Sequence, residues 1–292
     1  MRIDIEDIIP LLTQPREYEK YWTARCPFHE QEHQSHTPSL LVYKKDGFFV
    51  CKSCNAKGNL DKLHRALLGY RVSVSDDGNT QWVSPVLPPY SQLDIISDLV
   101  AEAHHVLLEH EHLAWYLERR GIADRIDACR LGWYDGWITI PILNAAGAVM
   151  GLVVRAGPHI EANTEARFSQ PKGQPGMLYI PDHKLVTKSD TMFVTYGIFD
   201  TLSLSSIRLC SCSPTTGKGN MKAEFLDFWK GRVVMVPDQN EEETAFKFAA
   251  SLPPARQAKV CLLEYSSGLK DPNDYLKQGL KTELEKQLER YK

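Results

Sequence analysis

Apolar and polar residues follow three different patterns along the chain. Residues 1–70 begin with a short amphipathic segment, continue with alternating residues, and end in the helical pattern "NLDKLHRALLGY". Residues 71–92 are rich in Ser, Asp, Gly and Pro and lack a helical period, which is typical of a linker. From residue 93 onward the pattern is dense and continuous. We therefore predict a small N-terminal domain, a linker and one larger body.

The larger body begins with predicted helices and a hairpin, and then predicted strands alternate with predicted helices. Residues 93–121 place apolar side chains three and four positions apart, which predicts one or two helices ending at Gly121. Residues 136–156 predict two strands joined by a turn at 144–147. The strand patterns "TMFVTY", "GRVVMVPD" and "KVCLLEY" then alternate with helical patterns, the last of which covers residues 275–292. This alternation predicts parallel pairing in an open α/β sheet.

Composition narrows the class of protein but leaves its function open. Hydrophobic residues make up 43% of the chain, which indicates a globular protein. No apolar run has the length of a membrane span, and the start "MRIDIEDIIPLL" is too acidic for a signal peptide. We therefore expect a cytoplasmic protein without a membrane partner. The net charge of −3 gives no sign of nucleic-acid binding, although a local groove of cations can still bind phosphates.

Cysteine and histidine gather on either side of a predicted hairpin. The predicted metal ligands form two pairs, each with two intervening residues: Cys26 and His29, and Cys51 and Cys54. This spacing lets both side chains of a tight knuckle reach one metal, and four such ligands complete the tetrahedron of a structural zinc ion. The alternating segment between the pairs turns at Asp46–Gly47, a hairpin signal that returns the second pair to the first. His33 and His36 compete with His29, but the two-residue spacing favours His29.

The segment "CPFH…TPSLLVYKKDGFFVCKSCNAKGNLDKLH" resembles the N-terminal zinc ribbon of bacterial replicative primases and phage primase–helicases. The family has a Cys-Pro-x-His pair, a "TPS" strand, and Cys-x-x-Cys followed by a glycine and a helix. All four elements occur here in that order. The resemblance implies a ribbon that scans single-stranded DNA. Candidate contacts to phosphates and bases are Lys44, Lys45, Lys52, Lys57 and Phe48. The alternative is a solvated lysine face with Phe48 in the ribbon core.

The middle of the chain resembles the start of the primase polymerase domain. That domain has a "YL-x-x-RG" helix, a strand ending in Pro-Ile, and a glycine-rich strand ending in arginine. The segments "YLERRGI" and "GWITIPILNAAGAVMGLVVRA" follow this order, and "ARFSQPKGQPGMLY" matches the basic stretch after them. The resemblance implies that Arg155, Arg167 and Lys172 bind nucleic acid or nucleotide. Arginine suits this role because its planar fork fits a phosphate group, although each residue can equally be a surface ion-pair partner.

The C-terminal strands and helices resemble a Toprim domain, a Rossmann-like module of primases and topoisomerases. Such domains hold divalent metal on carboxylates at the carboxyl ends of parallel strands. Three segments carry the family pattern. The Glu-Gly motif with a later Asp corresponds to Tyr196, Gly197 and Asp200; the Asp-x-Asp motif corresponds to Asp238 and Asn240; and the Lys-Asp-Pro motif corresponds to Lys270, Asp271 and Asp274. The resemblance implies catalytic Asp238, Asp271 and Asp200. It also implies a Mg²⁺ or Mn²⁺ site on Asp238, Asn240, Asp271 and Asp274, with Lys270 among the nucleic-acid-binding residues.

Two positions depart from the Toprim pattern. Tyr196 replaces the motif's glutamate, which removes a metal ligand and a candidate general base, because a neutral tyrosine binds Mg²⁺ poorly. Asn240 replaces the second Asp of the Asp-x-Asp motif and adds no charge. Residues 241–243 are all glutamates, and they either supply a substitute ligand or favour the start of the next helix through its dipole. The sequence therefore predicts a weakened metal site.

Two functions follow from the resemblance. One is a DNA primase that binds single-stranded DNA and joins ribonucleotides into short RNA primers. The other is a catalytically inactive, primase-derived protein that binds single-stranded DNA or a replication partner. We predict an α/β protein with a zinc ribbon at 1–70, a linker at 71–92, the N-terminal part of a primase core at 93–188, and a Toprim-like subdomain at 189–292. Any helicase would be a separate protein. The small size and the altered motifs suggest a phage or mobile-element origin. A topoisomerase or nuclease with a Toprim domain is a third alternative, which is disfavoured because the ribbon and the middle segment resemble primases.

Overall fold

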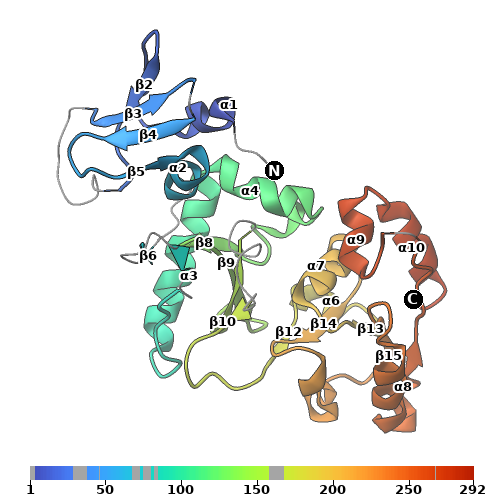
Figure 1. Cartoon of the computed structure of the whole chain (residues 1–292). Helices are drawn as coiled ribbons and strands as arrows, with labels where there is room; N and C mark the ends of the chain where they lie inside the picture. The colour runs from blue at the N-terminus through green and yellow to red at the C-terminus, as the bar shows by residue number, and fades with distance from the viewer. Residues whose placement is uncertain are drawn as a thin grey trace. The chain divides into compact units, whose positions relative to one another are not determined.

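The computed structural model describes residues 4–28, 38–45, 47–67, 73–74, 80–81, 85–157, 168–266 and 268–292. The chain divides into two compact units. Figure 1 colours the chain by residue number, from blue at the N-terminus to red at the C-terminus. The first comprises Met1–Pro85 with Tyr134–Trp137 and Ala156–Ala166. The second comprises Val86–Trp133, Ile138–Arg155 and Arg167–Lys292. Among the described residues, no helix has the length and apolar character needed to cross a membrane.

The first unit is built on a five-stranded antiparallel sheet. In spatial and chain order its strands are β1 (Arg16–Glu17), β2 (Tyr21–Ala24), β3 (Leu40–Tyr43), β4 (Phe48–Cys51) and β5 (Lys57–Asn59). The predicted hairpin is confirmed, because β3 and β4 pair with Leu40 opposite Cys51. Gly47 adopts a left-handed conformation in the connecting turn, while Asp46 lies outside the described residues.

Short helices cover the sheet of the first unit and close its core. They are α1 (Ile5–Ile8), the 3₁₀ helix η1 (Ile9–Leu11) and α2 (Leu60–Leu67), the last of which confirms the helix predicted at the end of this domain. Ile8 of α1 and Leu63 of α2 are fully buried with Leu40, Val42 and Phe49 of the sheet. The predicted linker also contains a short antiparallel pair, β6 (Ser73–Val74) with β7 (Thr80–Gln81).

Two helices and a four-stranded sheet precede the α/β region. The helices are α3 (Leu93–Glu109) and α4 (Glu111–Arg119), so the predicted helical stretch is broken at His110 and ends before Gly121, as expected. The 3₁₀ helix η2 (Ala123–Arg125) follows. The sheet has the order β11-β10-β9-β8 and contains β8 (Gly132–Tyr134), β9 (Trp137–Leu143), β10 (Val149–Ala156) and β11 (Phe168–Ser169). The predicted turn between β9 and β10 is confirmed, since the Asn144 side chain accepts hydrogen bonds from the backbone of Ala146 and Ala148.

The α/β region forms a five-stranded sheet with the order β12-β14-β13-β15-β16. Its strands are β12 (Leu178–Tyr179), β13 (Thr191–Val194), β14 (Ser211–Pro214), β15 (Arg232–Met235) and β16 (Lys259–Val260). All pairs are parallel except β12 with β14, which confirms the predicted parallel alternation. Because β14 and β15 lie on opposite sides of β13, the direction of winding reverses between β13 and β15. Ligands bind at such a reversal in open α/β sheets.

The α-helices of this region are α6 (His183–Val186), α7 (Ile198–Ser206), α8 (Glu242–Ser251), α9 (Pro272–Lys277) and α10 (Lys281–Glu289). The 3₁₀ helices are η3 (Lys218–Asn220), η4 (Ala223–Leu226) and η5 (Pro254–Arg256). The predicted final helix is divided in two, because Gly279 between α9 and α10 adopts a left-handed conformation. The predicted strand at 259–265 is shorter than expected and ends at Val260, shortly before a tight turn in which Tyr265 donates to the Leu263 carbonyl.

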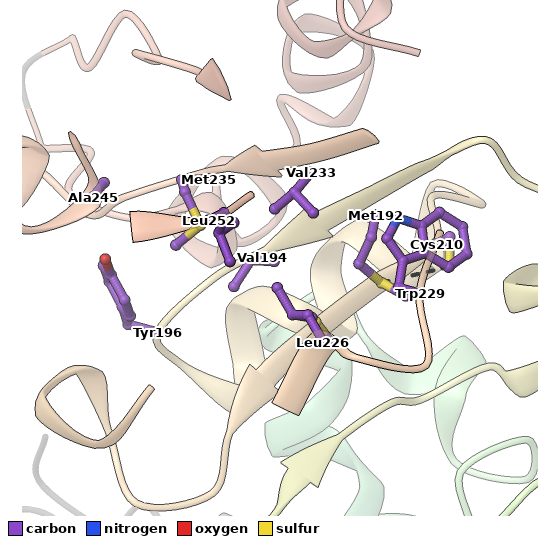
Figure 2. Packing of buried hydrophobic residues seen from close by; sticks show 11 residues of the cluster. Met192, Val194, Tyr196, Cys210, Leu226, Trp229, Val233, Met235, Ala245 and Leu252 are labelled. Atoms are coloured by element: carbon purple, nitrogen blue, oxygen red, sulfur yellow. Dashed lines mark hydrogen bonds between the residues drawn. The ribbon is translucent and has the colours of Figure 1, made fainter. Parts of the chain in front are cut away.

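One face of this sheet packs against α8. Met192, Val194 and Tyr196 are alternate residues of β13 and its continuation, so their side chains point to the same face. Figure 2 shows them in one buried cluster with Met235 of β15, and the Tyr196 ring lies at the edge of the cluster toward Ala245 of α8. The helix α7 packs against β14 and α9. These two layers hold the carboxyl ends of β13 and β15 in place.

Candidate metal centre and carboxylate site

Three of the four predicted zinc ligands meet in the first unit. The sulfur atoms of Cys26, Cys51 and Cys54 all lie within 4.8 Å of one another. The Cys26 and Cys54 sulfurs are 3.8 Å apart, which is about the edge length of a tetrahedron with Zn–S bonds of ~2.3 Å. His29 lies outside the described residues, as do the alternatives His33 and His36. The three thiols therefore fit a structural zinc ion, which they would hold at the end of the β3–β4 hairpin.

The Cys51 knuckle is arranged to stabilise a thiolate. Burial by itself would raise the pKa of Cys51, but hydrogen bonds from Ser39 and from the backbone N–H groups of Cys54 and Ser53 lower it overall. Asn55 follows in the left-handed conformation that closes the turn. Because zinc binds the thiolate form, these donors prepare Cys51 for metal binding.

Three predicted carboxylates gather in the second unit at the carboxyl ends of parallel strands. Asp200 lies in the first turn of α7 after β13, Asp238 follows β15, and Asp271 lies between β16 and α9. Burial raises the pKa of Asp200 well above its ordinary value, and the charges of Asp271 and Asp238 raise it further. Burial also raises the pKa of Asp271. Among the described residues, only the cysteine group brings three ligand atoms within 4.8 Å, so the carboxylates form a more open set.

The backbone holds Asp200 in a fixed position. Its Oδ1 atom accepts a hydrogen bond of 3.1 Å from the backbone N–H of Asn273, and the residue is only 6% exposed. Its other oxygen lies against Gly197, where a Cβ atom would overlap it. The glycine of the Tyr196–Gly197 pair is therefore required for the close approach of this carboxylate.

Asp274 and Asn240, two predicted metal ligands, have local structural contacts. Asp274 accepts a 2.6 Å hydrogen bond from Lys277 on one oxygen and a 3.0 Å bond from the backbone of Lys270 on the other. Its own N–H caps the start of α9 by donating to Asp271. Asn240 is exposed in a left-handed turn, a conformation that asparagine adopts more readily than most residues. The contacts of Asp274 fix its side chain within the start of α9, whereas the Asn240 side chain lies at the surface.

Comparisons with known proteins agree with this arrangement. Residues 1–71 match the CHC2 zinc finger, the zinc ribbon of DnaG. The crystal structure of the Aquifex aeolicus primase, comprising its zinc-binding and RNA polymerase domains, covers 99% of this chain and 83% of its own, with a TM-score of 0.54 and 18% identity. The chain is DNA primase-like. This likeness confirms the predicted fold class, an α/β core of the primase type joined to a zinc ribbon.

Two further primases are similar to the chain. The DNA primase of Myxococcus xanthus is 26% identical over 145 residues, which are 45% of this chain and 23% of that primase. The chain thus spans less than a quarter of this relative. A DnaG primase catalytic domain bound to single-stranded DNA covers 69% of this chain and 80% of its own, with a TM-score of 0.52 and 15% identity. That structural likeness shows the fold.

Tyr196 occupies a hydrophobic position within the primase-like core. It is 6% exposed, and its hydroxyl has no hydrogen-bond partner among the described residues. Burial raises the pKa of Tyr196 to about 12, and the charges of Glu241 and Asp238 contribute. The hydroxyl is therefore neutral at pH 7. The ring also lines a cavity of about 380 Å³ together with Gly197, Phe168 and Thr215.

The predicted cation Arg155 lies inside the primase-like core, next to the carboxylates. It is 8% exposed, and its guanidinium carbon is 4.5 Å from the centre of the Phe199 ring and 4.8 Å from that of Phe168. Its charge also acts to lower the pKa of Asp200. Arg120 approaches the same Phe199 ring at 5.1 Å. Two arginines therefore bring positive charge to the helix that carries Asp200.

The other predicted cations of the core lie at the surface or outside the described residues. Lys270 and Lys172 have exposed side chains, and Arg167 lies outside the described residues. In the ribbon, Lys44 forms a 2.6 Å ion pair with Glu17, while Phe48 is 39% exposed and thus lies at the surface.

The structure also identifies residues that sequence reasoning missed. The Asn273 side chain donates to the Arg120 carbonyl and to the Ser203 hydroxyl, and it accepts from the Arg120 guanidinium. Tyr265 donates to the Pro237 carbonyl beside Asp238. Asn273 lies inside the Lys-Asp-Pro motif, so the sequence indicated that this position matters. The motif does not show which residues the Asn273 side chain hydrogen-bonds. These residues hold α4, α7 and α9 together around the carboxylates.

The raised pKa of Asp200 predicts a pH-dependent stability. Because the folded pKa exceeds the unfolded value near 3.8, the folded chain keeps a proton that the unfolded chain releases as the pH rises. The stability of the second unit therefore falls as the pH rises from that value toward the folded pKa. We expect Asp200→Asn to raise the free energy of unfolding at pH 7 by on the order of 1 kcal/mol, which is roughly 2–4 °C in melting temperature.

Thermal unfolding between pH 4 and pH 8, without added divalent metal, tests this expectation. The gain should shrink as the pH falls toward 4, because the unfolded chain then also holds the proton for part of the time. Asp227→Asn, a change to an exposed carboxylate in the same unit, serves as control. If Asp200→Asn stabilises the chain equally at every pH, the raised pKa of Asp200 is not the cause of the gain.

Proposed function

We propose that the protein is a DNA primase that binds single-stranded DNA and synthesises short RNA primers. The observation that carries the proposal is that Asp238 and Asp271 lie close enough to Asp200 for their charges to raise its pKa, at the sheet reversal of a primase-like core. A buried carboxyl whose pKa is raised by the charges of two nearby carboxylates favours a divalent cation site. The residues from 189 onward would then form a Toprim-like subdomain, and residues 93–188 would form the N-terminal part of the core.

In this proposal the cation site is made mainly by three residues. Asp238, Asp271 and Asp200 would hold Mg²⁺ or Mn²⁺, and Asn240 would contribute at most a carbonyl oxygen. A cation bound there would neutralise charge on the attacking and leaving oxygens of nucleotidyl transfer. The primer's 3′ hydroxyl attacks the α-phosphorus of a ribonucleoside triphosphate, so that a new P–O bond forms and pyrophosphate leaves. Arg155, held beside Asp200, would place positive charge near the phosphates.

The template would contact both parts of the chain. A related DnaG catalytic domain has been solved with single-stranded DNA, which supports the same kind of partner for this chain. Exposed Phe48 and Lys57 on adjacent strands of the ribbon combine an aromatic face with a cation, the pairing that single strands favour. Lys172, Lys270 and Arg167 remain proposed contacts of the core.

A primer-synthesis assay tests the proposal. The zinc-loaded protein receives single-stranded DNA of mixed sequence, labelled ribonucleotides, and Mg²⁺ or Mn²⁺. We expect RNA products from the natural chain and a fall of at least a hundred-fold in Asp238→Ala, because the metal loses its central ligand. Asp227→Ala, which removes an exposed carboxylate elsewhere in the same unit, should leave synthesis unchanged. Equal synthesis by all three proteins would exclude the carboxylate site.

Tyr196 favours a second candidate, a primase-derived protein that binds single-stranded DNA without catalysis. It packs as part of the hydrophobic core where the Toprim motif has a glutamate. The same assay separates the two functions, since this candidate binds the DNA but yields no primer with either metal. Tyr196→Glu would then restore the missing ligand, and a gain of synthesis in that variant would identify the tyrosine as the cause of inactivity.

A further inference from the structure

A second cavity, of about 430 Å³, lies at the opposite end of α7 from the carboxylates. Its walls come from the turn between β9 and β10, the segment after η2, and the segment from β12 to α6. Arg208, two residues beyond α7, completes the lining. The nine residues of α7 span roughly 13 Å between Gly197 and this end. The cavity is therefore separate from the candidate catalytic site.

Three cations and one carboxylate line this cavity. The cations are Arg125, Lys184 and Arg208, and the carboxylate is Asp182. Asp182 is already engaged, because one of its oxygens accepts a 3.0 Å hydrogen bond from the backbone of Lys184. Arg125 is only 5% exposed and forms a 3.0 Å ion pair with Asp124 through one nitrogen, while its Nε atom has no hydrogen-bond partner among the described residues. The lining therefore carries more positive than negative charge.

Two arginines at this end of the fold have unusual backbone conformations. Arg208 (φ 62°) and Arg130 (φ 48°) are left-handed, although both carry a Cβ atom. Arg208 occupies the position after α7 at which glycine is usual, and its N–H donates to the Ser205 carbonyl. A terminal nitrogen of Arg130 lies 3.6 Å from the place of a Cβ on Gly147, a residue of the cavity wall. Glycine would be less strained at both positions, so backbone stability does not account for an arginine at either one.

We propose that this cavity binds the phosphate groups of a free nucleotide or of another small polyphosphate. Guanidinium groups offer paired donors that match phosphate oxygens. The volume falls within the range of small-molecule sites, which suits one nucleotide-sized ligand better than a continuous strand. The proposal does not depend on catalysis at the carboxylates, because the two sites share no lining residue.

Calorimetric titration of the full zinc-loaded chain with inorganic pyrophosphate tests the proposal, without added divalent metal. Arg208→Gly removes the guanidinium and relaxes a left-handed backbone, so the variant should melt at the same or a higher temperature. We expect Arg208→Gly and Lys184→Gln each to weaken pyrophosphate binding about ten-fold or more. Lys259→Gln, which removes an exposed cation from β16, should leave the affinity unchanged.

The same variants, titrated with a labelled single-stranded oligonucleotide, identify the source of the phosphate. If pyrophosphate binds and only the two cavity variants lose affinity, the site takes free polyphosphates. If only the oligonucleotide affinity falls in those variants, the cavity binds a phosphate of the strand, and the small-ligand proposal is wrong. The proposal is also overturned if pyrophosphate does not bind at millimolar concentration, or if Lys259→Gln weakens binding as much as Arg208→Gly.

Discussion

Replacing Cys51 by alanine is expected to release zinc and unfold the ribbon, while the second unit keeps its fold. Cys51 is fully buried, lies within 4.8 Å of the Cys26 and Cys54 sulfurs, and accepts hydrogen bonds from Ser39 and from the backbone of Ser53 and Cys54. A structural zinc ion contributes roughly 10–16 kcal/mol of apparent folding free energy in small ribbons. The remaining core of this unit, centred on Leu40, Val42 and Phe49, is too small to offset that loss.

Cys261→Ala provides a matched control for this experiment. Cys261 is also fully buried, but it lies in the second unit, and burial raises the pKa of its thiol to about 11. Both variants lose the same sulfur atom, so the difference between them reports the metal. Zinc content by mass spectrometry and hydrogen exchange of β2, β3 and β4 are the measurements. A Cys51→Ala chain that retains zinc and protected strands would disprove the site.

Asn273→Ala is expected to lower the free energy of unfolding of the second unit by about 3 kcal/mol. The Asn273 side chain is 1% exposed and forms three hydrogen bonds, two with Arg120 and one with Ser203. Alanine would leave the Arg120 carbonyl and one nitrogen of the Arg120 guanidinium without these hydrogen bonds. Each lost bond costs about 1 kcal/mol or more. The melting temperature should fall by roughly 6–12 °C.

Thermal unfolding followed by circular dichroism measures this loss. Asn220→Ala is the control, because that side chain makes one exposed hydrogen bond to the Thr216 carbonyl. Asn220→Ala should change the free energy of unfolding by no more than about 0.5 kcal/mol. If Asn273→Ala melted no lower than Asn220→Ala, the link from Arg120 to Ser203 would not stabilise the unit.

Primer synthesis, where present, should also fall in Asn273→Ala, because the backbone of Asn273 holds Asp200.

Local patterns predicted most of the elements. The β3–β4 hairpin, the β9–β10 turn and the parallel β13–β15 pair all follow from alternation and from glycine and asparagine signals within a few residues. The boundaries were less accurate where the chain turns for tertiary reasons. The strand β16 is short, and the final helix is divided at Gly279. The resemblance to primases placed Asp200, Asp238 and Asp271 at strand ends, and in the structure the charges of Asp271 and Asp238 raise the pKa of Asp200.

By itself, the sequence determined the ribbon, the order of strands and helices, and the residue types available for metal and phosphate. These properties depend on spacing along the chain, which a single sequence records directly. The tertiary structure alone decided which charges are buried and what they contact. Asn273 meets Arg120 across 153 residues, Asp200 meets Asn273 across 73, and Arg155 lies between two aromatic rings. Such contacts arise when distant segments pack, because desolvation and close approach depend on the folded surroundings rather than on neighbours in sequence.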